Sequence, residues 1–366
     1  MQTARQLLEQ LLERRDLAEA QAYALLGLLT DPSLEPALAG ALLAALRAKG
    51  TTAEEVRGFA AAMRALARKP ALPDSPDAID IVGTGGDASG SLNLSTGAAL
   101  LTAACGMPVV KHGNRSISSR SGSADLIEQL GLKLPLDETG AARCLAATDF
   151  TFLFAPYYHP AMRALAPIRT ALGVRTIFNL LGPLTNPASP RYRLIGAYDS
   201  AAAQLMAETL AGMDIARAWV VHGAGGWDEV TPIGPFLAFE ITPGNVQRSV
   251  IDPQSLGLAS CGAAALAGGD AAVNAAALCA VFERRDRGAH LAALALQSGL
   301  ALHIAGRASS IEQGIATATA AVETGRAQAW LERLRQFARD EARDSMPDGA
   351  PGAAAPGAAP PPPRTP

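Results

Sequence analysis

Aromatic residues are scarce in this chain of 366 residues, since Phe, Trp and Tyr make up only 5% of it. Hydrophobic residues as a whole make up 49%, so alanine and leucine must provide most of the packing. Small side chains together with 35 glycines favour helices that approach one another closely. The length is sufficient for one large domain or two moderate ones with a substantial core.

A strong charge of either sign is also absent. The chain has 31 Lys and Arg residues against 34 Asp and Glu residues, which gives a formal net charge of −3. Proteins that bind nucleic acid generally carry a clear basic excess. We therefore expect no nucleic-acid partner, although local basic segments remain to be explained.

Cysteine is rare, and its spacing is uninformative. The four cysteines, Cys105, Cys144, Cys261 and Cys279, show no CxxC spacing, which excludes the usual zinc patterns and a disulfide framework. Each lies among alanines and leucines, so we expect most of them to be buried free thiols.

Long hydrophobic runs are missing as well. No stretch approaches the roughly 20 apolar residues that a membrane-spanning helix needs. The first residues, MQTARQLLEQLLERRDL, favour a charged amphipathic helix over a signal peptide, because Glu and Arg interrupt the apolar residues. We expect a cytoplasmic protein without a membrane partner.

The chain is predicted to begin with an all-helical domain over residues 1–70. Leu7, Leu8, Leu11 and Leu12 have helical spacing, and Thr51-Thr52-Ala53-Glu54-Glu55 resembles a capped helix start with acids in the first turn. The Pro-rich segment KPALPDSPD, residues 69–77, breaks the helical pattern and predicts a joint between domains.

Residues 77–344 are predicted to form a larger α/β domain. Short β-branched runs alternate there with helical segments, which predicts a mainly parallel central sheet flanked by helices. Predicted strands lie at 78–82, 109–111, 151–154, 192–195 and 219–221, and helices at 95–104, 124–130 and 201–213. Two more strands, 236–241 and 245–250, should meet at Thr242-Pro243-Gly244, and helices should return over 271–337.

The last residues, 345–366, are rich in Pro, Ala and Gly and have hardly any large apolar side chain. Such a segment buries too little surface to offset its chain entropy. We expect a disordered tail, and the alternative is a proline-rich docking peptide.

A glycine-rich turn, Gly83-Thr84-Gly85-Gly86-Asp87, follows the first predicted strand. Glycines allow positive φ angles and let backbone N–H groups approach a ligand. Asn93-Leu94-Ser95-Thr96 then supplies capping side chains before a helix whose free N–H groups attract anions. The spacing fits neither a P-loop nor GxGxxG. A plain tight turn is the alternative, but the two segments together favour phosphate binding.

A basic loop, Lys111-His112-Gly113-Asn114-Arg115, follows the next predicted strand, and five serines lie between Ser116 and Ser123. Two cations with many hydroxyls suit a second phosphate site. The alternative is a solvated basic loop. Asp125, at the start of the following helix, is better interpreted as a cap than as a catalyst.

The pair Asp228-Glu229 lies in a glycine-rich loop after a predicted strand. Such a pair is usually a solvated acidic loop, but it can hold Mg²⁺ when a polyphosphate lies opposite. Trp227 beside it either shapes a pocket or covers the loop.

Further along, Arg163, Arg169 and Arg175 are six residues apart, so they do not all lie on one helix face. One of them is expected to face a ligand. His159 is interpreted as a local hydrogen-bonding residue rather than a general base.

Four motifs in this order closely resemble the anthranilate phosphoribosyltransferase family of tryptophan biosynthesis. They are GTGGD with NLST, KHGNRSISSRSGSAD, HPAMR…PIR…RTIFNLLGPLTNP and VHG…DE, and the resemblance runs from about Leu7 to Leu334. It implies a small helical domain, a hinge and a larger α/β domain, usually in a homodimer joined through the helical domains. Part of 160–185 would pack against the helical domain.

The resemblance also implies the site residues. Mg²⁺, two ions per subunit, would be held at Ser95, Asp228 and Glu229, and anthranilate would contact Gly83, Asn114 and Arg169. Phosphoribosyl pyrophosphate would be bound at Gly83, Gly86, Asp87, Ser91, Asn93, Leu94, Ser95, Thr96, Lys111, His112, Gly113, Asn114, Arg115, Ser116, Ile117, Ser118, Ser119 and Ser123.

Three positions depart from the family pattern. Ser91 replaces the common threonine but keeps its hydroxyl, and Trp227 replaces a leucine beside the acidic pair. A usual asparagine corresponds to Gln297 or Ser298, in a region that we expect to lie away from the site.

The implied reaction displaces pyrophosphate from C1 of 5-phosphoribosyl 1-pyrophosphate with the amine of anthranilate. An aromatic amine is largely neutral at pH 7, so no residue is assigned as general acid or base. The rate should come from positioning and charge neutralisation. The alternatives are a same-fold transferase or phosphorylase that acts on another aromatic amine or a nucleobase, and a non-catalytic binding paralogue.

Overall fold

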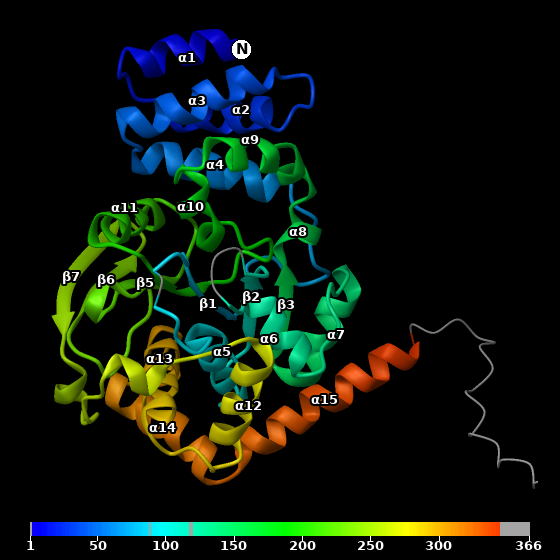
Figure 1. Cartoon of the computed structure of the whole chain (residues 1–366), viewed down its shortest axis with the longest axis vertical. Coiled ribbons are helices and arrows are strands. Elements are labelled where there is room, and N and C mark those ends of the chain that lie inside the picture. Colours follow the sequence, from blue (N-terminus) through cyan, green and yellow to red (C-terminus); the bar gives the residue numbers. More distant parts are fainter. Residues whose placement is uncertain (1, 88, 117–119, 345–366) are drawn as a thin grey trace, which may run out of the picture.

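The computed structural model describes residues 2–87, 89–116 and 120–344, and the expectations for Ile117, Ser118, Ser119 and the tail at 345–366 lie outside these residues. The chain forms an N-terminal helical domain and a larger α/β domain (Figure 1). In the part that is described, no helix combines the length and apolar character that a membrane crossing would require.

The first domain consists of α1 (Ala4–Leu12), α2 (Glu19–Leu29), α3 (Pro36–Lys49) and α4 (Ala53–Ala65). The capped start is confirmed, because the Thr52 hydroxyl accepts from the Glu55 N–H and the Glu55 carboxylate accepts from the Thr52 N–H. This reciprocal arrangement satisfies two N–H groups that the helix start would otherwise leave unpaired.

The larger domain is built on one seven-stranded sheet with the strand order β3-β2-β1-β4-β5-β6-β7. The first five strands in chain order are parallel, and β6 and β7 are antiparallel additions at one edge. Every predicted strand is confirmed within two residues: β1 (Ile79–Gly83), β2 (Val109–Gly113), β3 (Phe150–Phe154), β4 (Tyr192–Gly196), β5 (Arg217–His222), β6 (Phe236–Thr242) and β7 (Asn245–Ile251). The β6–β7 turn is Pro243-Gly244, where Gly244 has φ 73°.

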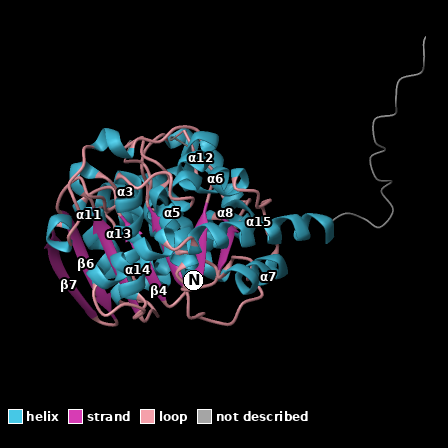
Figure 2. Ribbon diagram, turned by 90° about the horizontal axis from the view of Figure 1, so that it is seen from below, coloured by secondary structure: helices cyan, strands magenta, loops and turns pink. Residues whose placement is uncertain are grey.

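Helices cover both faces of the sheet (Figure 2). Those between the strands are α5 (Leu94–Ala104), α6 (Ser123–Gln129), α7 (Glu138–Thr148), α8 (Ala155–Tyr158), α9 (Ala166–Leu172), α10 (Phe178–Leu181) and α11 (Ser200–Ala211). Those after the sheet are α12 (Ala271–Phe282), α13 (Ala289–Ile304), α14 (Ile311–Glu323) and α15 (Arg326–Asp344). Short 3₁₀ turns lie at Pro160–Ala164, Gly182–Leu184, Ala224–Gly226, Pro253–Leu256 and Ala263–Leu266.

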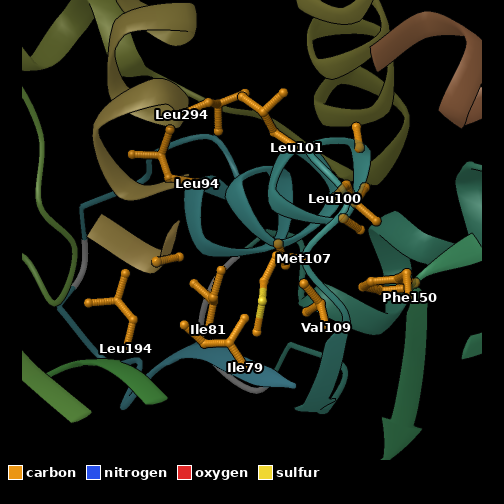
Figure 3. Close-up of a cluster of buried hydrophobic side chains, with 14 of the residues drawn as sticks. Ile79, Ile81, Leu94, Leu100, Leu101, Met107, Val109, Phe150, Leu194 and Leu294 are labelled. Atoms are coloured by element: carbon orange, nitrogen blue, oxygen red, sulfur yellow. The ribbon is translucent and has the colours of Figure 1, made fainter. Parts of the chain in front are cut away.

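Alternation along each strand divides the hydrophobic core between the two faces. Ile79, Ile81 and Leu194 pack against α5 and α13 on one face (Figure 3). Ile195 and Val220 point to the other face, where α11 and the N-terminal helices complete a second cluster. Burial on both faces is typical of parallel strands and explains their continuous apolar character.

The four cysteines are free, as expected, but only Cys144 is buried. The expectation that most would be buried is wrong. Cys105 lies at the end of α5, and Cys279 lies on a face of α12 that meets Arg335, with 3.3 Å between the guanidinium Nη2 and the sulfur. The alanines and leucines around each cysteine in the sequence therefore did not predict whether its thiol is buried.

Candidate functional site

A cleft of about 770 Å³ opens at the carboxyl ends of the parallel strands. The chain moves from β1 outward to β2 and β3 and then returns to place β4 and β5 on the other side of β1. Ligands of open α/β sheets bind at such a switch point, in the crevice beyond the strand ends. The volume is also within the range of small-molecule sites.

The cleft brings together the segments that the sequence singled out. Its walls include the glycine turn after β1, the start of α5, the loop after β2, Arg169 and the Asp228-Glu229 pair. Of the described residues predicted to bind a ligand, Leu94 alone does not line the cleft, because its side chain is fully buried in the core (Figure 3).

The glycine turn is held by the acidic loop. Gly85 and Gly86 have φ 69° and 77°, which favours glycine at both positions. The Gly85 N–H donates to Asp228 Oδ2 over 2.5 Å, and the Thr84 N–H donates to the Gly196 carbonyl over 2.9 Å. The N–H of Gly85 is therefore paired with a carboxylate.

Two glycines at strand ends make room for the acidic loop. An added Cβ at Gly83 would lie 2.4 Å from Asp228 Oδ2, and one at Gly196 would lie 1.4 Å from the Asp228 carbonyl oxygen. Gly83 and Gly196 are register partners on β1 and β4. The close approach of this loop to the sheet therefore requires glycine on both strands.

The Asn93 side chain does not cap α5, so that expectation is wrong. Its amide instead joins three distant segments: Nδ2 donates to the Ser121 carbonyl over 2.9 Å, and Oδ1 accepts from Ser121 Oγ at 3.0 Å and Asn274 Nδ2 at 2.8 Å. Tertiary partners have replaced the local cap.

The N-terminus of α5 already faces a negative charge. The Ser95 N–H donates to Glu229 Oε1 over 2.8 Å, whereas Glu229 Oε2 is buried without a partner. Asp87 joins the group, since its Oδ2 accepts from the Asp228 N–H at 3.3 Å. Helix N-termini favour anions at this position.

Burial and neighbouring negative charge raise the pKa of both members of the acidic pair. Burial, with the charges of Glu229 and Asp87, raises the pKa of Asp228 well above its usual value. Burial likewise raises the pKa of Glu229, against the opposing effects of Ser95 and Lys111. A buried group of acids with one unpartnered oxygen fits a divalent cation, which would offset the repulsion.

Within the described ranges, no three His, Cys, Asp or Glu side chains are arranged as a ready-made metal cage. This is compatible with Mg²⁺, which is usually bound by one or two carboxylates together with substrate phosphates and water.

The basic loop offers less free charge than its sequence suggested. Lys111 is buried, and its ammonium donates to the Ile81 carbonyl. Arg115 forms ion pairs with Asp125 and Glu128. Burial and the neighbouring His159 lower the pKa of His112 to about 3, so this imidazole is neutral. Both cations of the loop therefore have partners without a ligand.

Asp125 has the role that was expected of it. Its Oδ2 accepts from the Gly122 N–H at 2.9 Å and the Ser116 N–H at 3.2 Å, at the start of α6. Ser123 Oγ donates to the Asn114 carbonyl over 3.1 Å. These bonds hold the loop after β2 against the start of the next helix.

The three spaced arginines lie on different segments rather than on one helix, and two of them line the cleft where one was expected. Arg169 and Arg175 line the cleft, and Arg163 does not. The Arg169 guanidinium lies 5.2 Å from the centre of the Phe178 ring, and burial lowers its pKa. Arg175 was not singled out as a site residue, yet it donates to the Gly86 carbonyl over 2.9 Å and stacks on Tyr198.

Two open questions from the sequence are answered by packing. Trp227 is buried in the core and does not line the cleft, so it covers the acidic loop. His159 lies outside the cleft against His112, and burial lowers its pKa to about 4. Neither residue reaches the space where a ligand would lie.

The region of Gln297 is closer to the site than expected. Gln297 Nε2 donates to the carbonyl of Val230, the residue after Glu229, over 3.2 Å, and Ser298 Oγ donates to the Ala98 carbonyl in α5 over 3.1 Å. No residue of α13 lines the cleft, as expected, but α13 packs against α5 and Gln297 contacts the residue that follows the acidic pair.

Other residues of the cleft wall were not predicted. They are Val82, Thr84, Gly85, Ser89, Gly90, Leu92, Arg120, Ser121, Gly122, Arg175, Asn179, Tyr198, Gly269 and Asn274. The residues of the glycine turn and serine loop could have been included as neighbours of the motifs. Asn274 had no local signal, because it reaches the site through the docking of α12.

Comparisons with known proteins agree with the motifs. Residues 5–67 match the helical bundle domain of a glycosyl transferase family, and residues 75–328 match its a/b domain. An anthranilate phosphoribosyltransferase of Methylobacterium radiotolerans is 45% identical over 89% of this chain and 94% of its own length.

Solved structures of similar proteins cover nearly the whole chain. Anthranilate phosphoribosyltransferase from Thermus thermophilus has a TM-score of 0.84 and 38% identity, over 91% of this chain and 99% of its own. The Saccharomyces cerevisiae enzyme, in complex with PRPP and Mg, has a TM-score of 0.83 and 26% identity, over 92% of this chain and 98% of its own.

Proposed function

Because the chain belongs to the anthranilate phosphoribosyltransferase family, we propose that the cleft beyond β1 and β4 is where its two substrates meet. The chain transfers the phosphoribosyl group of 5-phosphoribosyl 1-pyrophosphate to the amine of anthranilate. The products are N-(5-phosphoribosyl)anthranilate and pyrophosphate, in a step of L-tryptophan biosynthesis. One observation supports this location above the others: the acidic pair, the glycine turn and Arg169 share one cleft at the switch point of the sheet.

We assign phosphoribosyl pyrophosphate to the wall that the glycine turn, the start of α5 and the loop after β2 form together. Gly86, Asn93, Thr96 and Ser123 line this wall and supply backbone and side-chain donors. Asn93 is held in place by Ser121 and Asn274, so the wall is preorganised before the substrate arrives. Lys111 lies beneath it and would contribute positive charge from a buried position.

The metal assignment is Mg²⁺ at Ser95, Asp228 and Glu229, with two ions per subunit. The unpartnered Glu229 Oε2 and the mutual repulsion of the acids support it. When it is bound, Mg²⁺ offsets the negative charge that develops on the departing pyrophosphate.

Anthranilate is assigned to Gly83 and Asn114, which border the wall assigned to phosphoribosyl pyrophosphate, and to Arg169, which reaches the cleft from α9. Arg169 suits the carboxylate, because a guanidinium binds it through two parallel hydrogen bonds. No acid–base residue is required for the attacking amine, which is neutral. The chemistry of this chain is therefore positioning, with the amine held against C1 while the far end of the sugar phosphate is bound.

Arg169 and the acidic pair belong to different parts of the molecule. Arg169 lies on α9, which packs on α3 of the helical domain, and an Arg47 guanidinium donates to the Arg175 carbonyl. Asp228 and Glu229 follow β5 in the sheet. Movement at the Pro-rich joint would bring Arg169 toward the acidic pair and exclude water from the reaction.

The remaining assignments concern organisation. We divide the chain into residues 1–70 with part of 160–185, then 77–344, then the tail at 345–366. We also propose a homodimer joined through the helical domains and a cytoplasmic location, where substrates with charged phosphates are retained. Light scattering of the purified chain tests the dimer.

The function is tested by the loss of anthranilate fluorescence in the presence of phosphoribosyl pyrophosphate and Mg²⁺. Asp228→Asn should lower the Mg²⁺-dependent rate by about 100-fold or more, with the fold retained, because a charged ligand is replaced by a neutral one. Asp340→Asn, on the exposed face of α15, is the matched control and should leave the rate unchanged.

Two results would count against these assignments. Unchanged Mg²⁺ dependence in Asp228→Asn would remove Asp228 from the metal site. If the wild-type chain consumes phosphoribosyl pyrophosphate with a nucleobase and not with anthranilate, the same-fold alternative replaces the main one. Binding without turnover would instead support a non-catalytic paralogue.

A further inference from the structure

A second cavity, of about 290 Å³, lies at the other end of the sheet from the cleft. Its walls come from segments that precede strands: Asp74 and Ser75 before β1, Pro187 to Ser189 before β4, and Met213 with Asp214 before β5. The amino ends of parallel strands share one edge, so this cavity is separated from the cleft by the length of the strands. We refer to it as the joint cavity.

The joint cavity lies between the two parts of the molecule. Arg64, in the last turn of α4, and Lys69, in the Pro-rich joint, reach it from the helical domain. Arg193 reaches it from β4, on the sheet face that carries Ile195. An occupant of this cavity would therefore contact both parts at their connection.

Three cations converge on two backbone carbonyls there. Arg64 Nη1 and Arg193 Nη1 both donate to the Leu184 carbonyl, over 3.0 Å and 3.5 Å, and Lys69 Nζ lies 3.5 Å from the Pro187 carbonyl. Two guanidinium groups thus share one oxygen. Burial and the charge of Arg64 lower the pKa of Arg193 to about 10, so the repulsion is felt in spite of Asp80 nearby.

The positive charge lacks a direct counter-charge. None of the three cations forms an ion pair within 4.0 Å with a carboxylate of the described residues. Asp80, a buried acid whose charge acts on Arg193, also faces Lys111 and accepts hydrogen bonds from Asn186 and the His112 N–H. The negative charge of one carboxylate is therefore shared between two buried cations.

Arg193 is also short of hydrogen bonds. The residue is only 1% exposed, and its Nε has no partner. A buried guanidinium with an unused donor costs free energy unless an acceptor is supplied. Asp74 and Asp214 also line the cavity but are exposed to solvent, whereas Arg193 is buried.

We propose that the joint cavity binds a compact oxyanion of the phosphate or pyrophosphate class. Guanidinium groups present paired donors that match such oxygens, and Ser75 and Ser189 add donors to the wall. The volume holds either anion with some water. A bound anion neutralises the repulsion between Arg64 and Arg193 and ties α4 to β4, so it stabilises the connection between the helical domain and the sheet. This site is independent of the reaction in the cleft.

Calorimetric titration of the full chain with inorganic phosphate, and separately with inorganic pyrophosphate, tests the site. Arg193→Gln should weaken binding at one site by about ten-fold or more, because a charged donor pair is lost. Lys69→Gln changes an exposed residue and should weaken it by about two- to five-fold without a risk to folding. Arg191→Gln, two residues before Arg193 and outside the cavity, is the control for net charge and should bind as the wild type does.

The cleft is common to all four proteins, so its own binding of phosphate cancels in the comparison. Crystals soaked in selenate locate the anion directly, and anomalous density between Arg64 and Arg193 is expected. The proposal is overturned if density lies only in the cleft, or if Arg193→Gln and Lys69→Gln both bind phosphate with wild-type affinity and stoichiometry. If the wild type binds pyrophosphate more tightly than phosphate, and Arg193→Gln does not, pyrophosphate is the preferred occupant of the joint cavity.

Discussion

Gly196→Ala should inactivate the protein by displacing the acidic loop, although the substitution adds a single methyl group on a strand. The new Cβ would lie 1.4 Å from the Asp228 carbonyl oxygen and 2.6 Å from its carbonyl carbon. Ordinary contact requires about 3.5 Å, so the loop backbone must retreat by about 2 Å. A side chain could rotate away, but a backbone segment that carries two site residues cannot.

The magnitude follows from that displacement. A misplacement of about 1 Å in an active site can cost about 100-fold in rate, which is about 2.7 kcal/mol of transition-state stabilisation. We expect at least this loss in Gly196→Ala. Overpacking of the interior should also lower the free energy of unfolding by about 1–3 kcal/mol. The rate is measured by anthranilate fluorescence and the stability by urea denaturation.

Two further glycine substitutions calibrate the result. In Gly83→Ala the added Cβ would lie 2.4 Å from Asp228 Oδ2. This carboxylate can rotate away if it gives up its hydrogen bond to the Gly85 N–H, so the loss of catalytic rate should be smaller than in Gly196→Ala. In Gly27→Ala, within α2, nothing lies within 4 Å of the Cβ, and we expect full activity with about 0.5–1 kcal/mol of added stability. Full activity in a folded Gly196→Ala protein would refute the reasoning.

Three other predictions concern polar side chains. His159 has a pKa lowered to about 4, so its contribution to stability is present above pH 6.5 and is lost as the pH falls. As the pH falls from 6.5 to 4, the free energy of unfolding of the wild type should therefore decrease by about 1.4 kcal/mol per pH unit relative to that of His159→Gln. Urea denaturation at a series of pH values measures both, and an equal pH dependence in the two proteins would contradict this. Asn274→Ala removes a 2.8 Å hydrogen bond to Asn93 and should raise KM for phosphoribosyl pyrophosphate more than it lowers kcat. An unchanged KM would show that Asn93 keeps its position without this hydrogen bond. Arg175→Gln frees the Gly86 carbonyl and should lower kcat/KM by about ten-fold, whereas Arg163→Gln, outside the cleft, should have no effect; equal effects would exclude the contact as the cause.

The architecture was largely predictable because its signals are local. Alternation of β-branched runs with helical periods depends on neighbours in the sequence, and all seven strands followed from it within two residues. The meeting of the glycine turn, the serine loop and the acidic pair was also predictable, since the carboxyl ends of parallel strands share one edge.

Side-chain partners were much less predictable. Asn93 looked like a helix cap from its position before α5, but Ser121 and Asn274 offered it better-placed partners. Arg115 looked like a phosphate ligand, yet it is paired with Glu128 and Asp125. In each case a distant residue competed successfully with the local option.

The sequence by itself determined the sheet, its helices and the three segments that surround the cleft, because hydrophobic periodicity and turn residues act over a few positions. Tertiary structure alone decided that Gln297 supports the acidic loop and that Trp227 covers it. It alone also created the joint cavity, where Arg64 and Arg193 meet at the Leu184 carbonyl. The physical reason is that such contacts depend on how whole helices dock against the sheet, and no short stretch of the chain encodes that geometry.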